Sequence, residues 1–197
     1  DDLIYKKRML HAGLEAAAPF GTAALAAMGI CTKINMVPMY VAMGFSQGVM
    51  PFISYNYSSG DHKRMRGALS FSIKIVEVML VLSAAAMFFF AGLLVRAFIG
   101  DQETVAYGAR FLRGFCLAQP FLALDFLCVG VFQAVGMGRE ALVLAILRKA
   151  VFEIPLLYLL NRFFPLYGLP YAQAVTECVM AAIAVGLVVR FLRGLKK

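Results

Sequence analysis

Long apolar runs separated by short polar connections limit how this chain can fold. Five such runs are present, at about residues 20–51, 68–95, 105–135, 141–164 and 169–192. A helix needs about 20 mostly apolar residues to span a bilayer, and each run is long enough. Backbone exposed to lipid must bond within its own segment, and these runs are too long for barrel strands. We therefore expect an all-α, polytopic membrane helix bundle with about five transmembrane helices.

The composition supports a membrane protein and argues against other classes. Hydrophobic residues make up 62% of the chain and charged residues 15%, whereas soluble domains have about 45–50% and about 25%. The net charge of +8 comes from Lys and Arg at the ends of the runs, a pattern that fits contact with anionic lipid headgroups. Because these residues form no single polar face, nucleic acid is not an expected partner.

Features of enzymes and of metal proteins are missing from the sequence. It has no glycine-rich phosphate loop, no cluster of metal-ligand residues and no Ser/His/Asp grouping. Its four cysteines lie within apolar runs and form no CxxC pair, so we expect small buried hydrophobic side chains. We predict neither an enzyme nor a protein with a bound cofactor.

The sequence divides into a polar N-terminal segment, residues 1–19, and a transmembrane bundle, residues 20–197. The chain begins with Asp1 in place of methionine, and its first residues do not resemble a signal peptide. The basic residues Lys6, Lys7 and Arg8 precede the first run. Either an upstream helix constrains this segment or it lies along the membrane interface, and both alternatives stay open.

Basic residues predict the orientation in the membrane. One set of connections and ends holds most of them, namely His62, Lys63, Arg64, Arg66, Arg139, Arg190, Arg193, Lys196 and Lys197. The other set holds fewer, and two of its neighbours are acidic: Arg96, Arg110, Arg113 and Arg162, with Asp101 and Glu103. By the positive-inside rule, the first set is cytoplasmic. We expect a multi-pass protein of the cytoplasmic (inner) membrane with its C-terminus inside the cell.

Four ionisable residues fall near the middle of the predicted spans: Lys33, Asp125, Glu153 and Glu177. Translocon scales give a central charge a cost of about 2.5–3.5 kcal/mol, so such residues usually face a bundle interior or a water-filled cavity. The functional interpretation is coupling to H⁺ or another cation, or recognition of a cationic substrate. The structural alternative is an ion pair between Lys33 and a carboxylate that only holds helices together.

Two prolines lie next to these carboxylates. Pro120 follows Gln119 and precedes Asp125, and Pro155 follows Glu153. Proline removes a backbone donor and loosens the helix one turn earlier, and the freed carbonyl groups can line a cavity. A kink beside a carboxylate favours an ion site or a hinge, although a packing kink explains it equally well. We include Gln119 with the four ionisable residues as candidates for ion coupling or substrate binding.

Two further basic residues, Arg148 and Lys149, lie in the fourth run near its predicted cytoplasmic end. Long basic side chains near a helix end can reach the headgroups. We therefore expect both to anchor the helix at the membrane interface and to take no part in the site.

Several separated segments, in order, resemble the C-terminal half of a MATE (multidrug and toxic compound extrusion) transporter. They are AALAAMGICTKI (23–34), GFSQGVMPFISYNYSSGDHKRMR (44–66), FQAVGMG (132–138), LRKAVFEIPLL (147–157) and GLPYAQAVTE (168–177). Together they extend over most of residues 20–193. Each segment alone is modest, but the ordered set is fairly specific.

The resemblance implies two bundles of six helices around a central cavity, with H⁺ or Na⁺ uptake driving export of cationic lipophilic drugs. This chain would hold about five helices of one lobe, and the N-terminal lobe would be its partner. Asp125 lies in a helix in which some members carry a cation-binding carboxylate. Glu153 stands where the family usually has an apolar residue, and Glu177 stands where a shorter Asp is common.

Two other functions remain as alternatives. A lipid-linked oligosaccharide flippase of related fold handles large anionic head groups and would line its cavity with Arg and Lys. The predicted midplane instead holds three acids and one base, which favours cationic substrates. The other alternative is a truncated membrane fragment that does not transport, because a partial lobe lacks half of the cavity.

Overall fold

The computed structural model describes residues 21–163 and 168–195, and every regular element in these ranges is a helix. The all-α prediction is therefore confirmed. The helices are α2 (Thr22–Ser58), α3 (His62–Phe89), α4 (Ala91–Arg96), α5 (Gln102–Cys116), α6 (Gln119–Ala134), α7 (Gly138–Ile146), the π-helix η2 (Leu147–Glu153), α8 (Ile154–Phe163) and α9 (Gly168–Gly194). The predicted N-terminal segment, residues 1–19, lies outside the described residues.

Three helices of the described part, α2, α3 and α9, are each long and apolar enough to cross a membrane. The pair α5 and α6 forms a fourth candidate span that bends by 46° at the break between the two helices. Pro120 occupies the first turn of α6, where its missing N–H would have no partner within the helix. The predicted irregularity at this proline is confirmed. The remaining run, as far as Phe163, lies in the unbroken succession α7, η2 and α8.

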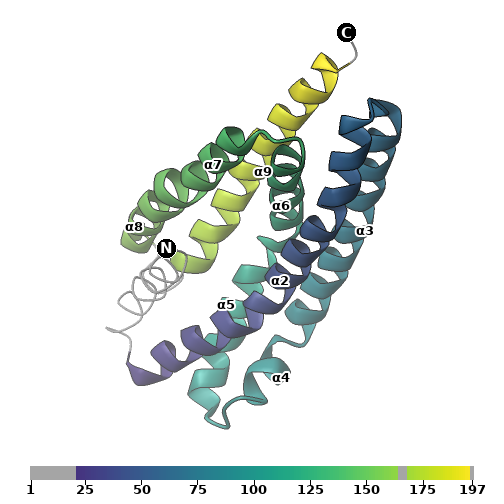
Figure 1. Ribbon diagram of the computed structural model, residues 1–197. Helices are drawn as coiled ribbons and strands as arrows, with labels where there is room; N and C mark the ends of the chain where they lie inside the picture. The colour runs from purple at the N-terminus through teal and green to yellow at the C-terminus, as the bar shows by residue number, and fades with distance from the viewer. Residues whose placement is uncertain (1–20, 164–167, 196–197) are drawn as a thin grey trace.

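Helix α6 occupies the centre of the bundle. It packs against α2, α3, α7 and α9, and Figure 1 shows it between the α2–α3 pair on one flank and the α7–α8 run on the other. Its buried side chains, such as Leu127 and Phe132, belong to two core clusters shared with these neighbours. Any polar group on the buried face of α6 is consequently enclosed by other helices.

The basic connections gather at one end of the bundle, as the charge pattern predicts. Near this end, the ring of Phe191 on α9 lies 6.0 Å from that of Tyr57 on α2 and 6.1 Å from that of Phe132 on α6. The guanidinium of Arg66 on α3 donates a hydrogen bond to the carbonyl of Leu192. Figure 1 shows the α2–α3 turn and the C-terminus at the same end. The two ends of the bundle thus differ in charge.

At the opposite end, the connection before α5 terminates in a helix cap. The side chain of Asp101 accepts hydrogen bonds from the hydroxyl of Thr104 at 2.6 Å and from its backbone N–H at 2.9 Å. These bonds hold the pKa of the Asp101 carboxyl below its usual value. A cap of this kind satisfies amide groups that a helix start leaves without partners, so it fixes where α5 begins.

The outer surface of the bundle carries large apolar side chains. Phe89 is 78% exposed, Tyr55 is 71% exposed and Phe163 is 67% exposed. Soluble monomers rarely expose apolar surface over wide areas. Such a surface is typical of helices that face lipid, or a further helical bundle, along much of their length.

Helix α9 also approaches α5 closely, at Gly114. A Cβ atom added to Gly114 would lie 2.7 Å from Cβ of Pro170, which is closer than real Cβ atoms approach other atoms. Pro170 is buried and its ring cannot rotate away. The contact therefore requires glycine on α5.

We expect Gly114→Ala to lower the free energy of unfolding by about 1–3 kcal/mol, because overpacking forces the helices apart. Gly186→Ala is the matched control, since nothing lies within 4 Å of a Cβ atom added on this part of α9. Thermal unfolding of the two purified variants in detergent measures the difference. Equal stability of both variants would contradict the close contact between α5 and α9.

Candidate functional site

A buried arginine joins two of the predicted carboxylates. Arg148 Nη1 lies 2.8 Å from Asp125 Oδ2, and Arg148 Nη2 lies 2.6 Å from Glu177 Oε1. The three residues come from η2, α6 and α9 and are 9%, 1% and 1% exposed. The guanidinium also lies over the ring of Phe126, 4.9 Å from its centroid. We call Asp125, Arg148, Glu177, Lys149 and Glu153 the ion cluster.

The π-helix explains how η2 contributes two buried residues to this cluster, beside the partly exposed Lys149. In a π-helix the hydrogen bonds join residues five apart, so Arg148 and Glu153 lie close to one face. They are the two buried residues of η2. Pro155 lies two residues beyond the end of η2. Because proline has no backbone N–H, the carbonyl group four residues earlier lacks its usual hydrogen-bond donor. The wider turn thus lies where the sequence places a proline beside a carboxylate.

A second ion pair lies within η2 itself. Lys149 Nζ is 2.6 Å from Glu153 Oε2, and the two side chains are 39% and 5% exposed. The charge of Glu153 is therefore balanced mainly by Lys149 on the same helix, whereas Asp125 and Glu177 share the guanidinium of Arg148. If all five groups are ionised, three carboxylates face two bases and the cluster carries one negative charge in excess.

Each of the two bridged carboxylates keeps one oxygen without a partner. Asp125 Oδ1 and Glu177 Oε2 are buried and make no hydrogen bond with any described residue, and the same holds for the hydroxyl of Thr176. An unsatisfied buried polar atom costs about 1–3 kcal/mol, and more where the group is charged. These oxygens are acceptors held in an apolar interior, and binding a proton or a small cation would relieve that cost.

The expectation that Arg148 and Lys149 anchor the helix at the headgroups is wrong for Arg148, which is buried and paired. Arg148 lies eight residues beyond Glu140, so at 1.5 Å per residue it is about 12 Å along the helix from the nearest connection. Two signals in the sequence indicated that Arg148 is buried. One is this depth, and the other is a predicted midplane that holds three acids and only one base. Lys149 is partly exposed but pairs inward with Glu153.

The other two candidate residues lie apart from the ion cluster. Lys33 is exposed on α2, and among the described residues it forms no ion pair, so the expected pairing of Lys33 with a carboxylate is not found there. Gln119 is 1% exposed, and its Nε2 lies 3.2 Å from Sδ of Met87 on α3. Gln119 thus joins α6 to α3, away from Arg148.

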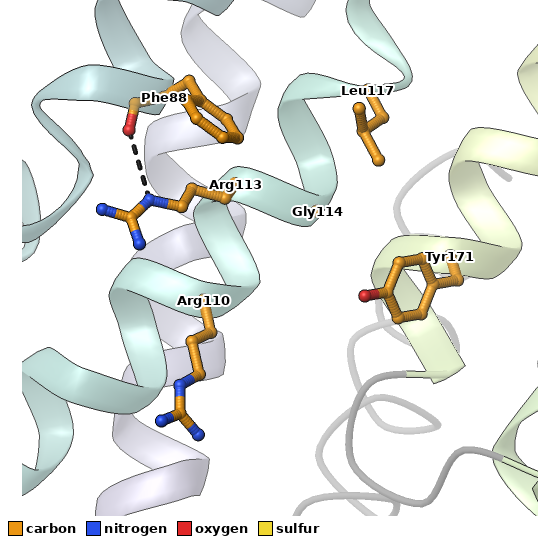
Figure 2. A pocket seen from close by; sticks show the side chains of 6 residues that line it. All are labelled: Phe88, Arg110, Arg113, Gly114, Leu117 and Tyr171. Carbon is orange, nitrogen blue, oxygen red and sulfur yellow. Dashed lines mark hydrogen bonds between the residues drawn. The ribbon is translucent and has the colours of Figure 1, made fainter.

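A pocket of about 410 Å³ lies near the less basic end of the bundle. Figure 2 shows its lining, with Arg110 and Arg113 from α5, Tyr171 from α9, and Phe88 from α3. Arg113 Nε donates to the carbonyl of Phe88 at 3.4 Å, and its guanidinium lies 5.6 Å from the centroid of that ring. The lining of this pocket thus combines two guanidinium groups with aromatic rings.

Comparison with known proteins gives one family. A family model described as MatE matches residues 16–159. "Multidrug export protein MepA" of Staphylococcus aureus strain MSSA476 is 31% identical over 176 residues, which cover 89% of this chain and 38% of the relative. MepA of Staphylococcus saprophyticus matches with the same identity and coverage. The chain thus corresponds to about two fifths of the length of these relatives.

Solved structures share the fold. A crystal structure of MATE in the straight conformation superposes with a TM-score of 0.89 at 17% identity, over 98% of this chain and 44% of the other. The Vibrio cholerae MATE transporter VcmN in the bent form gives a TM-score of 0.83 at 22% identity, over 92% of this chain and 41% of the other. The expectation that the chain resembles one lobe of a larger bundle agrees with this coverage.

The bridge from Arg148 to two buried carboxylates should contribute to the stability of the fold. Arg148→Met leaves two buried carboxylates without their cation, and breaking a buried pair in this way costs about 3–5 kcal/mol. Adding Asp125→Asn and Glu177→Gln should recover most of that loss, because no buried charge then lacks a partner. Unfolding of the purified variants in detergent measures both effects.

Arg139→Met is the control, since Arg139 is exposed at the start of α7. A triple variant no more stable than Arg148→Met alone would show that Arg148 does not act through these two carboxylates.

Proposed function

Because this chain belongs to the MATE family of membrane transporters, we propose that it is one lobe of a cation-coupled antiporter that exports cationic lipophilic drugs. Family members are transporters and not enzymes. The relatives named MepA are multidrug export proteins, and this chain matches 38% of their length. We propose that an N-terminal lobe supplies the other half of the transport cavity.

The buried ion cluster is the observation that carries this proposal. Ionisable groups inside a membrane bundle are costly and usually belong to ion or substrate pathways. Asp125 and Glu177 are each 1% exposed and lie between α6, η2 and α9, so a drug-sized molecule has no access to them within the lobe. We therefore assign these carboxylates to the coupling ion, H⁺ or Na⁺, and place drug binding between the two lobes.

The charge of the ion cluster also bears on the flippase alternative. A pathway for large anionic head groups needs an excess of basic side chains, whereas the cluster has more acids than bases. The pocket with Arg110 and Arg113 in its lining lies near one end of the bundle, away from the middle of the predicted spans. Dye efflux compared with lipid flipping in vesicles separates the two functions.

We further propose that the protein resides in the cytoplasmic membrane with its C-terminus in the cytoplasm. The support is the gathering of basic residues at the end where α9 terminates. A fluorescent protein fused after Lys197 should fluoresce, and alkaline phosphatase fused at the same point should stay inactive. The reverse result would contradict this orientation.

In the complete transporter, we expect Asp125→Asn and Glu177→Gln each to reduce coupled drug efflux by at least tenfold at normal expression. Each change keeps the shape of the side chain but removes the charge that binds the coupling ion. Efflux of a fluorescent aromatic cation from cells checks the effect. Glu140→Gln is the control, because Glu140 is exposed at the start of α7.

Unchanged efflux in both carboxylate variants would remove the ion cluster from the coupling mechanism. The fragment alternative is tested separately by expressing residues 1–197 alone. On the present proposal this chain exports nothing without its second lobe, and export by the chain alone would contradict the two-lobe requirement.

A further inference from the structure

The geometry of the ion cluster bears on which cation it can bind. Arg148 already occupies one oxygen of Asp125 and one oxygen of Glu177, at 2.8 and 2.6 Å. It therefore stands where a cation bound by both carboxylates would have to lie. Any further cation must bind beside a fixed positive charge in a medium of low dielectric constant, where like charges repel strongly.

A metal cation finds few ligands in this arrangement. Hard cations bind through a shell of several oxygen atoms at short distances. Within the described residues, no group of three or more His, Cys, Asp or Glu side chains is arranged to hold a metal ion. On α6 and α9, the buried carboxylate and hydroxyl oxygens that lack a partner among the described residues are Asp125 Oδ1, Glu177 Oε2 and the hydroxyl of Thr176. Glu153 is engaged by Lys149.

A proton needs only one of these atoms. It can bind Asp125 Oδ1 or Glu177 Oε2 while Arg148 keeps its bond to the other oxygen of each carboxylate. Among the described residues, the titratable and charged groups that interact at the site are Asp125 and Cys128 on α6, Arg148, Lys149 and Glu153 on η2, and Glu177 on α9. Their charges sum to one negative charge with the thiol neutral, so a single proton makes the cluster neutral.

We propose that the coupling ion at this site is H⁺, and that Arg148 is a specificity-determining residue that excludes Na⁺ by serving as a permanently attached cation. This inference rests on the proposed function, because it names the ion that the same carboxylates bind. The added proton forms an O–H bond at one carboxylate, which becomes neutral. Arg148 stays charged throughout and is then held mainly by the other carboxylate.

The role of Arg148 has a testable consequence for ion selectivity. Replacing it with glutamine leaves two buried carboxylates facing each other and releases two oxygens that the guanidinium had occupied. The glutamine carbonyl adds another possible ligand. The variant should therefore gain a response to Na⁺ that the natural protein lacks. Arg148→Lys keeps the positive charge, although an ammonium group cannot bridge two carboxylates as a planar guanidinium does, and it should remain insensitive to Na⁺.

The experiment uses the complete transporter in proteoliposomes, with ethidium as the transported probe. One set of vesicles has a pH gradient and no Na⁺, and the other has a Na⁺ gradient at equal pH on both sides. We expect the pH gradient to drive transport by the natural protein at least tenfold faster than the Na⁺ gradient does. For Arg148→Gln, we expect the response to Na⁺ to exceed that of the natural protein at least fivefold. Arg139→Gln should behave as the natural protein.

Transport by the natural protein that is driven by Na⁺ at equal pH would overturn the inference and leave cation coupling intact. Transport driven by neither gradient would overturn the proposed function itself. A second measurement covers the case in which Arg148→Gln does not transport. NaCl should raise the unfolding temperature of purified Arg148→Gln above its value in choline chloride, with no such shift for the natural protein or for Arg148→Lys. Absence of this difference would overturn the role of Arg148 in excluding Na⁺.

Discussion

The placement of an arginine inside an apolar bundle is the constraint on which the arrangement of this lobe depends. An ionised guanidinium is stable there only with anionic partners at hydrogen-bond distance, and Asp125 and Glu177 supply them from two different helices. The interaction sets the rotation of α6 and α9 about their axes, since each carboxylate must face η2. The apolar contacts around it, such as those of Met180 and Cys128, then close the interior against water.

The same interaction limits what the site can do. Two carboxylates without a cation would repel each other, and would have to be neutralised before the helices could pack. With Arg148 between them, they can remain ionised inside the bundle and still keep one open oxygen each. A site of this kind combines a stable packed state with an acceptor atom that is still open, and the proposed coupling to an ion requires both properties.

The sequence predicted the helices well, because the length and composition of an apolar run determine a membrane helix almost by themselves. It also pointed to Asp125, Glu153 and Glu177, since a carboxylate in the middle of such a run is costly wherever it lies. It did not predict their partner. Whether Arg148 reaches outward to headgroups or inward to acids depends on which side of its helix faces the bundle. That side is set by the π-helix η2, which changes the rotation of the residues before Pro155 relative to the regular helical period. The exposure of Lys33 was missed because the apolar run of α2 does not show which side of that helix faces the bundle.

Helix α9 contacts both of the helices that form the bend between α5 and α6. Helix α9 runs past the break and is attached on both sides of it, to α5 where Pro170 meets Gly114 and to α6 through Glu177 and Arg148. Helix α9 therefore connects the two helices that meet at the break. The two attachments lie on either side of the bend of 46°. One is a close apolar contact and the other is electrostatic, so a change of charge at either carboxylate alters the hold of α9 on α6 and leaves its contact with α5 unchanged.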